Sequence, residues 1–268
     1  MDDMEQSRFE KATDKNLPAD CVGSVVHAFT VLHAFDLEHR EMTLSEVAER
    51  IDMTRAGARR YLLTLIFLGY VAQDGRLFRL TPKVLDLGFS YLSTLGLVDI
   101  AQPFLNRIAR ETNETAAIAV LDDRDVVHLA RARVQKELAP VVTIGRRFSA
   151  LYNSTGRVLI AHMADEAIKS FIDSADLTGP TAYSITSRAK LLTELKQIRV
   201  QGFAIVDQES ELGLRSIAVP ILDRRDRFVA ALNVITSVAA IPSEELQTRI
   251  LPVLRAAASE ISQALVTD

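Results

Sequence analysis

The sequence predicts an α+β protein with a helical N-terminal domain and a larger C-terminal domain built on an antiparallel sheet. Two observations lead to this fold class. Short helical segments followed by a hairpin fill the first 80 residues, and strand-like segments separated by polar turns dominate residues 98–268. Strands joined by hairpins pair antiparallel and need helices to cover them. A chain of 268 residues is long enough for two such domains.

Composition and charge exclude several classes of protein. Hydrophobic residues make up 48% and charged residues 25%, as in ordinary globular proteins. The net charge is −4, so any attraction to nucleic acid has to come from a local patch. The single cysteine, Cys21, excludes internal disulfides and a thiolate metal cluster. No apolar run approaches the ~20 residues of a membrane helix. We therefore expect a cytoplasmic protein without membrane contact, and a disordered or mobile arm over residues 1–20.

Residues 21–80 have the pattern of a winged helix-turn-helix. A first helix is expected over 22–35 from its apolar spacing. Thr43 and Glu46 form a capping box that begins a second helix, and Thr54 caps a third after a turn of about three residues. Asp74-Gly75 then joins two short apolar–polar runs, which predicts a hairpin. Three helices followed by a two-stranded hairpin indicate DNA binding.

The third helix is expected to enter the major groove with its first turns. Its arginines can bind guanine or phosphate, and small residues let the helix approach the bases. The alternative is that these arginines only solvate an exposed helix face. The candidate contacts to double-stranded operator DNA are Thr43, Thr54, Arg55, Ala58, Arg59, Arg60 and Arg76.

Residues 81–97 are predicted to form a linker helix, with Pro82 in its first turn. The segment is more apolar than a free linker tolerates, with Leu85, Leu87 and Tyr91 among its residues. It either packs on its own domain or pairs with the same helix of a second subunit. We favour the second, because an operator-reading dimer has to join two DNA-binding domains.

Residues 98–268 are expected to form a binding module. Strands are predicted at 139–144 and in the segments TAAIAVL, VVHLARARV, FAIVD, RSIAVPIL and RFVAALNVI. A closing helix over Ser243–Val266 is expected to kink at Pro252. The histidines have no metal-pair spacing, and no nucleophile or phosphate-loop motif is present. The sequence therefore favours neither an enzyme, nor a cofactor, nor a metal site. An enzyme with an accessory DNA-binding domain and a pure protein-interaction module stay as alternatives.

Three segments give the chain a family resemblance. YLLTLIFLGYVAQDGRLFRLTPKVLDLG, VTIGRRFSALYNSTGRVLIA and GFAIVDQESELGLRSIAVPILDRRDRFVAALNV resemble the IclR family of bacterial transcription regulators over about residues 22–265. AGARRYLLTL, DGRLFRLTPKVLDLGFSYLS and IAQPFLNRIA are similar to the branch that regulates the β-ketoadipate pathway. That branch senses protocatechuate, 4-hydroxybenzoate or β-ketoadipate. A regulator of another carbon-source pathway is the alternative within the family.

The resemblance implies a GAF-like effector domain, a homodimer or homotetramer, and a small carboxylic-acid effector of aromatic or ketoadipate-like type. Two positions depart from the glyoxylate-responsive member: its cysteine is Ser216 here, and its paired serines are Asn233 and Ile235. Loss of a hydrogen-bonding side chain at Ile235 points to a larger, partly apolar ligand, for which Phe148 and Tyr152 could form a wall. The implied effector contacts are Phe148, Tyr152, Ser154, Thr155, Gly156, Asp207, Leu214, Ser216, Asn233 and Ile235.

Overall fold

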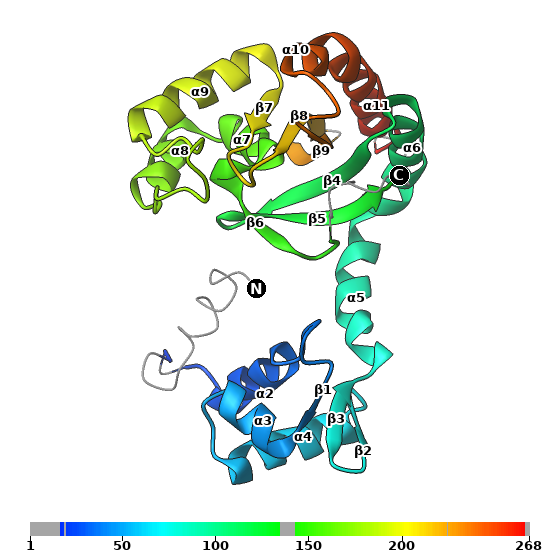
Figure 1. Cartoon of the computed structure of the whole chain (residues 1–268), viewed down its shortest axis with the longest axis vertical. Coiled ribbons are helices and arrows are strands. Elements are labelled where there is room, and N and C mark those ends of the chain that lie inside the picture. Colours follow the sequence, from blue (N-terminus) through cyan, green and yellow to red (C-terminus); the bar gives the residue numbers. More distant parts are fainter. Residues whose placement is uncertain (1–16, 19, 135–142, 224, 266–268) are drawn as a thin grey trace. The chain divides into compact units, whose positions relative to one another are not determined.

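The computed structural model describes residues 17–18, 20–134, 143–223 and 225–265. The chain divides into two compact units, Met1–Thr94 and Leu95–Asp268 (Figure 1). The arm predicted over residues 1–20 and most of the strand predicted over 139–144 lie outside the described residues.

The first unit is a small helical domain with a three-stranded sheet. Its elements are α2 (Gly23–His33), β1 (Glu41–Thr43), α3 (Leu44–Arg50), α4 (Arg55–Phe67), β2 (Val71–Asp74) and β3 (Leu77–Leu80). All strands pair antiparallel in the order β1-β3-β2. Apolar side chains from each element bury in one core, including Val31, Met42, Val47, Leu62, Leu65 and Phe78. The winged helix-turn-helix order predicted from the sequence is present.

Two details of this unit differ from the sequence prediction. The polar segment before Thr43 includes strand β1, in which Met42 is buried opposite Phe78. A strand of three residues with one inward side chain has too little periodicity to be recognised. The apolar spacing of residues 62–68 predicts that Leu63 of α4 and Leu68, which follows it, point inward, but they are 41% and 46% exposed. The buried stripe of α4 is therefore narrower than predicted.

The predicted linker helix divides at Gly96. The 3-10 turn η2 (Pro82–Val84) and helix α5 (Leu85–Leu95) come first, and α6 (Leu97–Thr112) follows. Gly96 has a positive φ of 59°, which ends α5 and lets the chain begin a new helix. Leu97, predicted to be the last residue of the linker, is thus the first residue of α6.

The second unit is a six-stranded antiparallel sheet with helices on both faces, as predicted. Its strands are β4 (Thr115–Asp122), β5 (Asp125–Ala132), β6 (Arg147–Ser149), β7 (Ala204–Asp207), β8 (Leu214–Leu222) and β9 (Phe228–Ser237), in the order β6-β5-β4-β9-β8-β7. Helices α6 and α11 (Leu251–Ala264) lie on one face. Helix α7 (Ser154–Ala161) packs on the other, with α8 (Asp165–Asp173) and α9 (Arg188–Gln201) beyond it (Figure 1).

The closing helix is interrupted before its proline. A short α10 (Ser243–Glu245) leads into a π-helical turn, Leu246–Ile250, and α11 then begins. Pro252 is the second residue of α11, where its missing N–H costs nothing. The wider turn before it removes the clash that a proline ring makes with the preceding turn. The predicted irregularity is present, but N-terminal to Pro252 rather than centred on it.

A buried ion pair fixes α7 to the segment after β7. Arg157 is 1% exposed and donates to both carboxylate oxygens of Glu209, at 2.6 and 2.5 Å. Its Nε donates to the Leu151 carbonyl oxygen at 2.7 Å, and Glu209 also accepts the Ile185 amide at 2.9 Å. Each of the three guanidinium nitrogens thus has an acceptor, which is the kind of pairing that makes a buried charge tolerable. Among the helices of the described residues, none is long and apolar enough to cross a membrane.

Candidate functional site

Helix α4 begins with a well-formed cap. Thr54 has extended backbone geometry, and its Oγ1 accepts the Gly57 amide at 3.1 Å. The capping box predicted before α3 is also present: the Thr43 amide donates to the Glu46 carboxylate at 2.6 Å, and the Glu46 amide donates to Thr43 Oγ1. Since the hydroxyl groups of Thr43 and Thr54 already accept a backbone amide, these two residues position the helices of the motif.

The arginines of α4 lie at its exposed N-terminal end. Arg55, Arg59 and Arg60 are exposed, and the first turn contains no acidic residue. Within the described part of the chain, their guanidinium groups form no ion pair or hydrogen bond. Arg55 and Arg59 are four residues apart and so share one face of the helix. These cations are available to bind phosphates or base edges.

Ala58 does not belong to this exposed surface. Its side chain is fully buried against the domain core, so the expectation that it contacts DNA is wrong. Position 58 lies on the inward stripe together with Leu62 and Leu65. A methyl group there lets α4 pack closely on the core, and the exposed small residue of this turn is Ala56.

The hairpin of β2 and β3, which is the wing of the motif, carries one more arginine at its tip. Strands β2 and β3 are joined by Gly75 and Arg76, and Gly75 has a φ of 57° that the tight turn requires. The Gln73 amide group donates to the Gly75 carbonyl oxygen at 2.9 Å and stiffens the turn. Arg76 is exposed and has no partner within the described residues. A stiff turn therefore presents Arg76 for a phosphate contact.

The second candidate site lies on the face of the six-stranded sheet that packs on α7, called the α7 face below. Strand register assigns residues to this face, because paired residues of antiparallel strands point to the same side. Three rows follow: Thr115, Ile235 and Ser216; Arg131, Ala117, Asn233 and Ala218; and His128, Ala119 and Ala231. Ala119, Ala218 and Ala231 pack with the buried residues of α7, which fixes the side of the sheet.

Several side chains on this face and at the start of α7 are buried and have no hydrogen-bond partner within the described residues. They contribute the hydroxyl groups of Thr115 and Ser154, both ring nitrogens of His128, Nη1 of Arg131, and both amide atoms of Asn233. Thr115, Ser154 and Asn233 are 0% exposed, and His128 is 1% exposed. Buried polar atoms in native proteins are almost always paired, and each one left unpaired costs about 1–3 kcal/mol. This concentration of unpaired atoms therefore indicates a ligand site.

The structure brings most of the implied effector contacts to this region. Ser216, Asn233 and Ile235 lie on the α7 face, and Leu214 lies on it at the edge, opposite Ser237. Phe148 of β6 pairs with Val126 on the same face and packs edge-on against His128, with ring centroids 5.5 Å apart.

The three implied contacts at the start of α7 differ in whether they are available to a ligand. The Ser154 hydroxyl is free of partners within the described residues, whereas the Thr155 hydroxyl donates to Asn153 Oδ1 at 2.5 Å. At Gly156, an added Cβ would lie 2.2 Å from the Ala150 carbonyl oxygen. Gly156 is therefore required for backbone packing, and Ser154 is the residue best placed to bind a ligand.

Asp207 is not part of the α7 face. It pairs in register with Arg215, and both residues point to the opposite side of the sheet from Ser216. Their ion pair measures 3.0 Å, and Arg215 also donates to the Ile241 carbonyl oxygen at 2.8 Å. The expectation that Asp207 contacts the effector is therefore wrong: its carboxylate is satisfied by Arg215 elsewhere.

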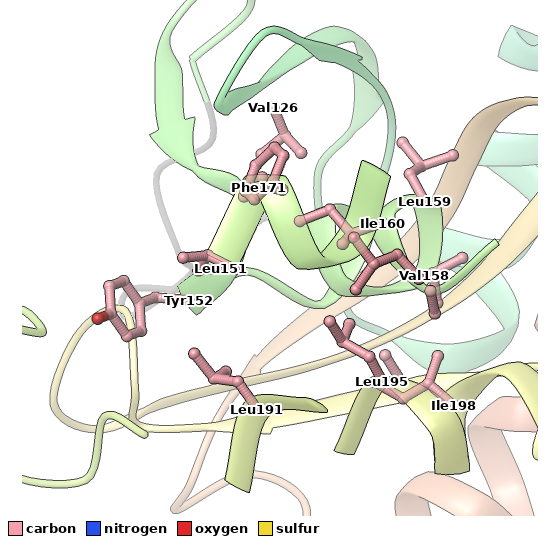
Figure 2. Close-up of a cluster of buried hydrophobic side chains, with 14 of the residues drawn as sticks. Val126, Leu151, Tyr152, Val158, Leu159, Ile160, Phe171, Leu191, Leu195 and Ile198 are labelled. Carbon is pink, nitrogen blue, oxygen red and sulfur yellow. The ribbon is translucent and has the colours of Figure 1, made fainter. Parts of the chain in front are cut away.

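Tyr152 lies at the edge of the apolar cluster that packs under α7. Figure 2 shows its ring beyond Leu151 and Leu191, with the hydroxyl group pointing away from the other labelled side chains. Burial, with the nearby Asp176 carboxylate, raises the pKa of Tyr152 above its usual value. The phenol stays protonated, so it can donate a hydrogen bond but supplies no charge.

Sequence reasoning missed Thr115 and His128. It counted Arg131 with Arg133, Arg146 and Arg147 as arginines near the predicted pocket strands, one of which could pair with the acid group, and singled out none of them. Burial lowers the pKa of His128 to about 4. The available signal was a histidine and an arginine inside the apolar run VVHLARARV. That signal is weak, because residues 128 and 131 alternate onto opposite faces of a regular strand.

Comparison with known proteins identifies the family. The model of the IclR helix-turn-helix domain matches residues 24–75, and that of the C-terminal domain of bacterial transcriptional regulators of IclR type matches residues 89–263. The chain belongs to the IclR family. It is 40% identical to the Pca regulon regulatory protein of Pseudomonas putida, over 92% of this chain and 85% of that protein. It is 35% identical to the p-hydroxybenzoate hydroxylase transcriptional activator of Acinetobacter baylyi, over 90% and 91%.

A solved structure shows the same arrangement of elements. The crystal structure of a regulator from Rhodococcus sp. RHA1 superposes with a TM-score of 0.85 at 40% identity, covering 92% of this chain and 99% of that one. The IclR assignment made from the sequence is thus confirmed. The chain is a DNA-binding transcription regulator and not an enzyme.

Proposed function

We propose that this protein regulates aromatic-acid catabolism of the β-ketoadipate type by changing its affinity for operator DNA when a small carboxylic acid binds. The observation that carries the proposal is that one chain combines exposed arginines on α4 with buried polar atoms on the α7 face, and that neither group has a partner within the described residues. The names of its relatives, a Pca regulon regulator and a p-hydroxybenzoate hydroxylase activator, support the pathway. Binding of the acid shifts the population of domain arrangements and thereby changes DNA affinity.

A homodimer or homotetramer is the proposed DNA-binding form. Leu85, Leu87 and Tyr91 of α5 are 69%, 48% and 51% exposed, which is unusual for apolar residues on one short helix. Pairing with α5 of a second copy would cover them and supply two DNA-binding units for the two halves of an operator. A regulator of this kind acts in the cytoplasm, where the chromosome is accessible.

The DNA-binding half is tested by titrating the DNA upstream of the protein's own gene. Arg59→Ala should weaken binding by about 1–3 kcal/mol if Arg59 contacts a base. Lys196→Ala, which removes an exposed cation from α9, is the matched control and should leave affinity unchanged. Equal losses in both variants would show that only net charge matters and would remove Arg59 from the contact surface.

The effector half is tested by a thermal-shift screen of small acids. It includes protocatechuate, 4-hydroxybenzoate, β-ketoadipate, muconate, pyruvate and glyoxylate. A ligand at 100 times its Kd should stabilise the folded protein by about 2.7 kcal/mol, which is readily detected as a rise in Tm. A selective response to an aromatic or ketoadipate-like acid, followed by altered DNA affinity, is the expected result. A response only to pyruvate or glyoxylate would instead favour another carbon-source pathway.

A further inference from the structure

We infer that strand β5 supplies the two side chains that select the effector: Arg131 binds its carboxylate, and His128 hydrogen-bonds a hydroxyl group at the opposite end of its ring. This inference rests on the proposed function, because it assigns residues and an effector class to the α7 face. It predicts that the protein prefers an aromatic monocarboxylic acid with a 4-hydroxyl group over an aliphatic dicarboxylic acid.

A β-bulge places the two residues on one face. Residues 128 and 131 are an odd number of steps apart, so a regular strand would point them to opposite sides of the sheet. The register instead shifts between Ile118 and Ala119, which pair with Ala130 and His128. Leu129 is the extra residue of the bulge. Because of it, Arg131 pairs with Ala117 and His128 pairs with Ala119, both on the α7 face.

The bulge also sets the spacing between the two positions on the sheet. Ala117 and Ala119 are two residues apart on β4, which corresponds to roughly 7 Å along the strand. This is comparable to the length of a benzene ring that carries one polar group at each end. Ala117 and Ala119, the β4 residues that pair with Arg131 and His128, carry only methyl groups, and Ala231 of β9 pairs with Ala119 on its other side. Ala117, which is not part of the apolar cluster under α7, is the small residue beside Arg131 on this face.

Arg131 has the chemistry of a carboxylate-binding residue. Its Nη1 is buried and has no acceptor within the described residues, and no other arginine nitrogen among them is in that state. Arg131 as a whole is half-buried, but a guanidinium group keeps its charge at every relevant pH, so its one buried nitrogen without a partner is costly. A carboxylate bound beside it would form a short charge-assisted hydrogen bond and relieve that cost. Arg157 and Arg215, by contrast, are already paired with Glu209 and Asp207.

His128 has the chemistry of a hydroxyl-binding residue. Both ring nitrogens lack partners within the part of the chain that the structure describes, and the Phe148 ring packs edge-on against the imidazole at an interplanar angle of 82°. Burial lowers the pKa of His128 to about 4, so the ring is neutral at pH 7. A neutral imidazole has one donor and one acceptor nitrogen, which matches a phenol group. A second carboxylate at this end would be buried without a balancing charge, which disfavours a dicarboxylic acid.

The test pairs each side chain with the ligand group that it is inferred to bind. Isothermal titration of the full chain first determines which of 4-hydroxybenzoate and 3,4-dihydroxybenzoate binds more tightly. That acid is compared with the analogue lacking the 4-hydroxyl group, with its uncharged amide, and with adipate. In the wild type, losing the hydroxyl group should weaken binding about 10-fold, and losing the carboxylate charge about 100-fold.

Two variants, each compared with the wild type for every ligand, complete a double-mutant cycle between protein side chains and ligand groups. In His128→Phe, which keeps an aromatic ring, removal of the ligand's hydroxyl group should cause no further loss, while the amide remains weak. In Arg131→Gln, the acid and its amide should bind equally, while the effect of the hydroxyl group remains. Melting temperature and circular dichroism establish that each variant is folded. If one variant does not fold, the other variant and the comparison of the aromatic acid with adipate in the wild type still test the inference.

Different results separate the inference from the function on which it rests. The inference is overturned if the hydroxyl effect in His128→Phe and the charge effect in Arg131→Gln equal those of the wild type, or if adipate binds more tightly than the aromatic acid. The proposed function then stands, provided that an aromatic or ketoadipate-like acid binds. If no such acid binds while the operator is still recognised, the proposed function and the inference both fail.

Discussion

Helix α4 and the α7 face both carry polar groups that have no partner among the described residues, but in opposite surroundings. Arg55, Arg59 and Arg60 stand in water, where an unpaired guanidinium group costs the folded protein nothing. The polar atoms of His128 and Asn233 are buried, where each one left unpaired lowers stability. The exposed DNA-binding arginines therefore do not lower the stability of the folded protein. The buried polar atoms of the α7 face do lower it in the ligand-free protein, and a bound acid would restore that stability.

This difference has a mechanistic consequence. A ligand that pairs the buried atoms of the α7 face stabilises the conformation that binds it, and only such differential stabilisation can shift a conformational equilibrium. The exposed arginines offer no comparable gain, because water already solvates them. Ligand binding at the α7 face of the second unit can thus supply the free-energy difference that shifts the protein between conformations. Helix α4 is suited to bind DNA. Substitutions that exchange or remove buried partners test this contrast.

The largest expected effect comes from breaking the buried ion pair. Glu209→Ala should lower the free energy of unfolding by about 3–5 kcal/mol, because it leaves the Arg157 guanidinium group buried without its carboxylate. Chemical denaturation at pH 7.5 measures the change. Arg59→Ala is the matched comparison from the exposed region and should stay within about 0.5 kcal/mol of the wild type. Equal losses in the two variants would contradict the contrast between the regions.

A second effect concerns stability at mildly acidic pH. His128 has a folded-state pKa of about 4, below the ordinary 6.5, so its neutral form is favoured by folding. The unfolded chain then binds the proton more readily, and stability is lost as pH falls from about 6.5 towards 4. The expected loss is about 2 kcal/mol at pH 5, from a shift of about 1.4 kcal/mol per pKa unit.

Denaturation curves of the ligand-free protein at pH 7.5 and pH 5 measure this loss. His128→Phe removes the titrating group and is the internal control, since every other ionisable group is retained. The wild type should lose about 2 kcal/mol more than the variant between the two pH values. A parallel pH dependence in the two proteins would mean that the His128 ring is hydrated or paired in solution.

The two regions also differ in what the sequence reveals. The motif around α4 is local: Thr43 with Glu46, then Thr54, then Asp74-Gly75 define caps and a turn within a few residues of each other. Those elements were predicted correctly, and the strands β4, β5, β7, β8 and β9 were predicted from alternation and turn residues. Ala58 was misassigned because periodicity gives the inward stripe only to within about one residue.

The α7 face was predicted less well because long-range pairing creates it. Ser216, Asn233 and Ile235 were placed by family resemblance, not by pattern. Asp207 was misassigned because only the register with Arg215 reveals which side of the sheet it occupies. His128 was missed, and Arg131 was not singled out from the other candidate arginines, because the two residues share a face only through the bulge at Leu129, which no local pattern predicts. The three-residue strands β1 and β6 were not predicted because they are too short to show an alternating pattern.

The smallest and most discriminating effect is a gain in stability. Asn233 is 0% exposed, and both atoms of its amide group lack partners within the described residues. Asn233→Leu replaces the amide by an apolar group of similar size, and should raise the unfolding free energy of the ligand-free protein by about 1–2 kcal/mol. Ala117 and Ala218, its neighbours in the sheet, leave room for the branched side chain.

The same substitution should weaken effector binding and the response of DNA binding to the effector, because the α7 face then has less destabilisation for a ligand to relieve. Denaturation, titration with the acid and operator binding measure the three quantities on one variant. A Thr193→Leu variant, on the exposed surface of α9, controls for the general effect of added apolar surface. Loss of stability in Asn233→Leu would show that the amide group is already satisfied in solution, and the α7 face would then not be the source of the switching free energy.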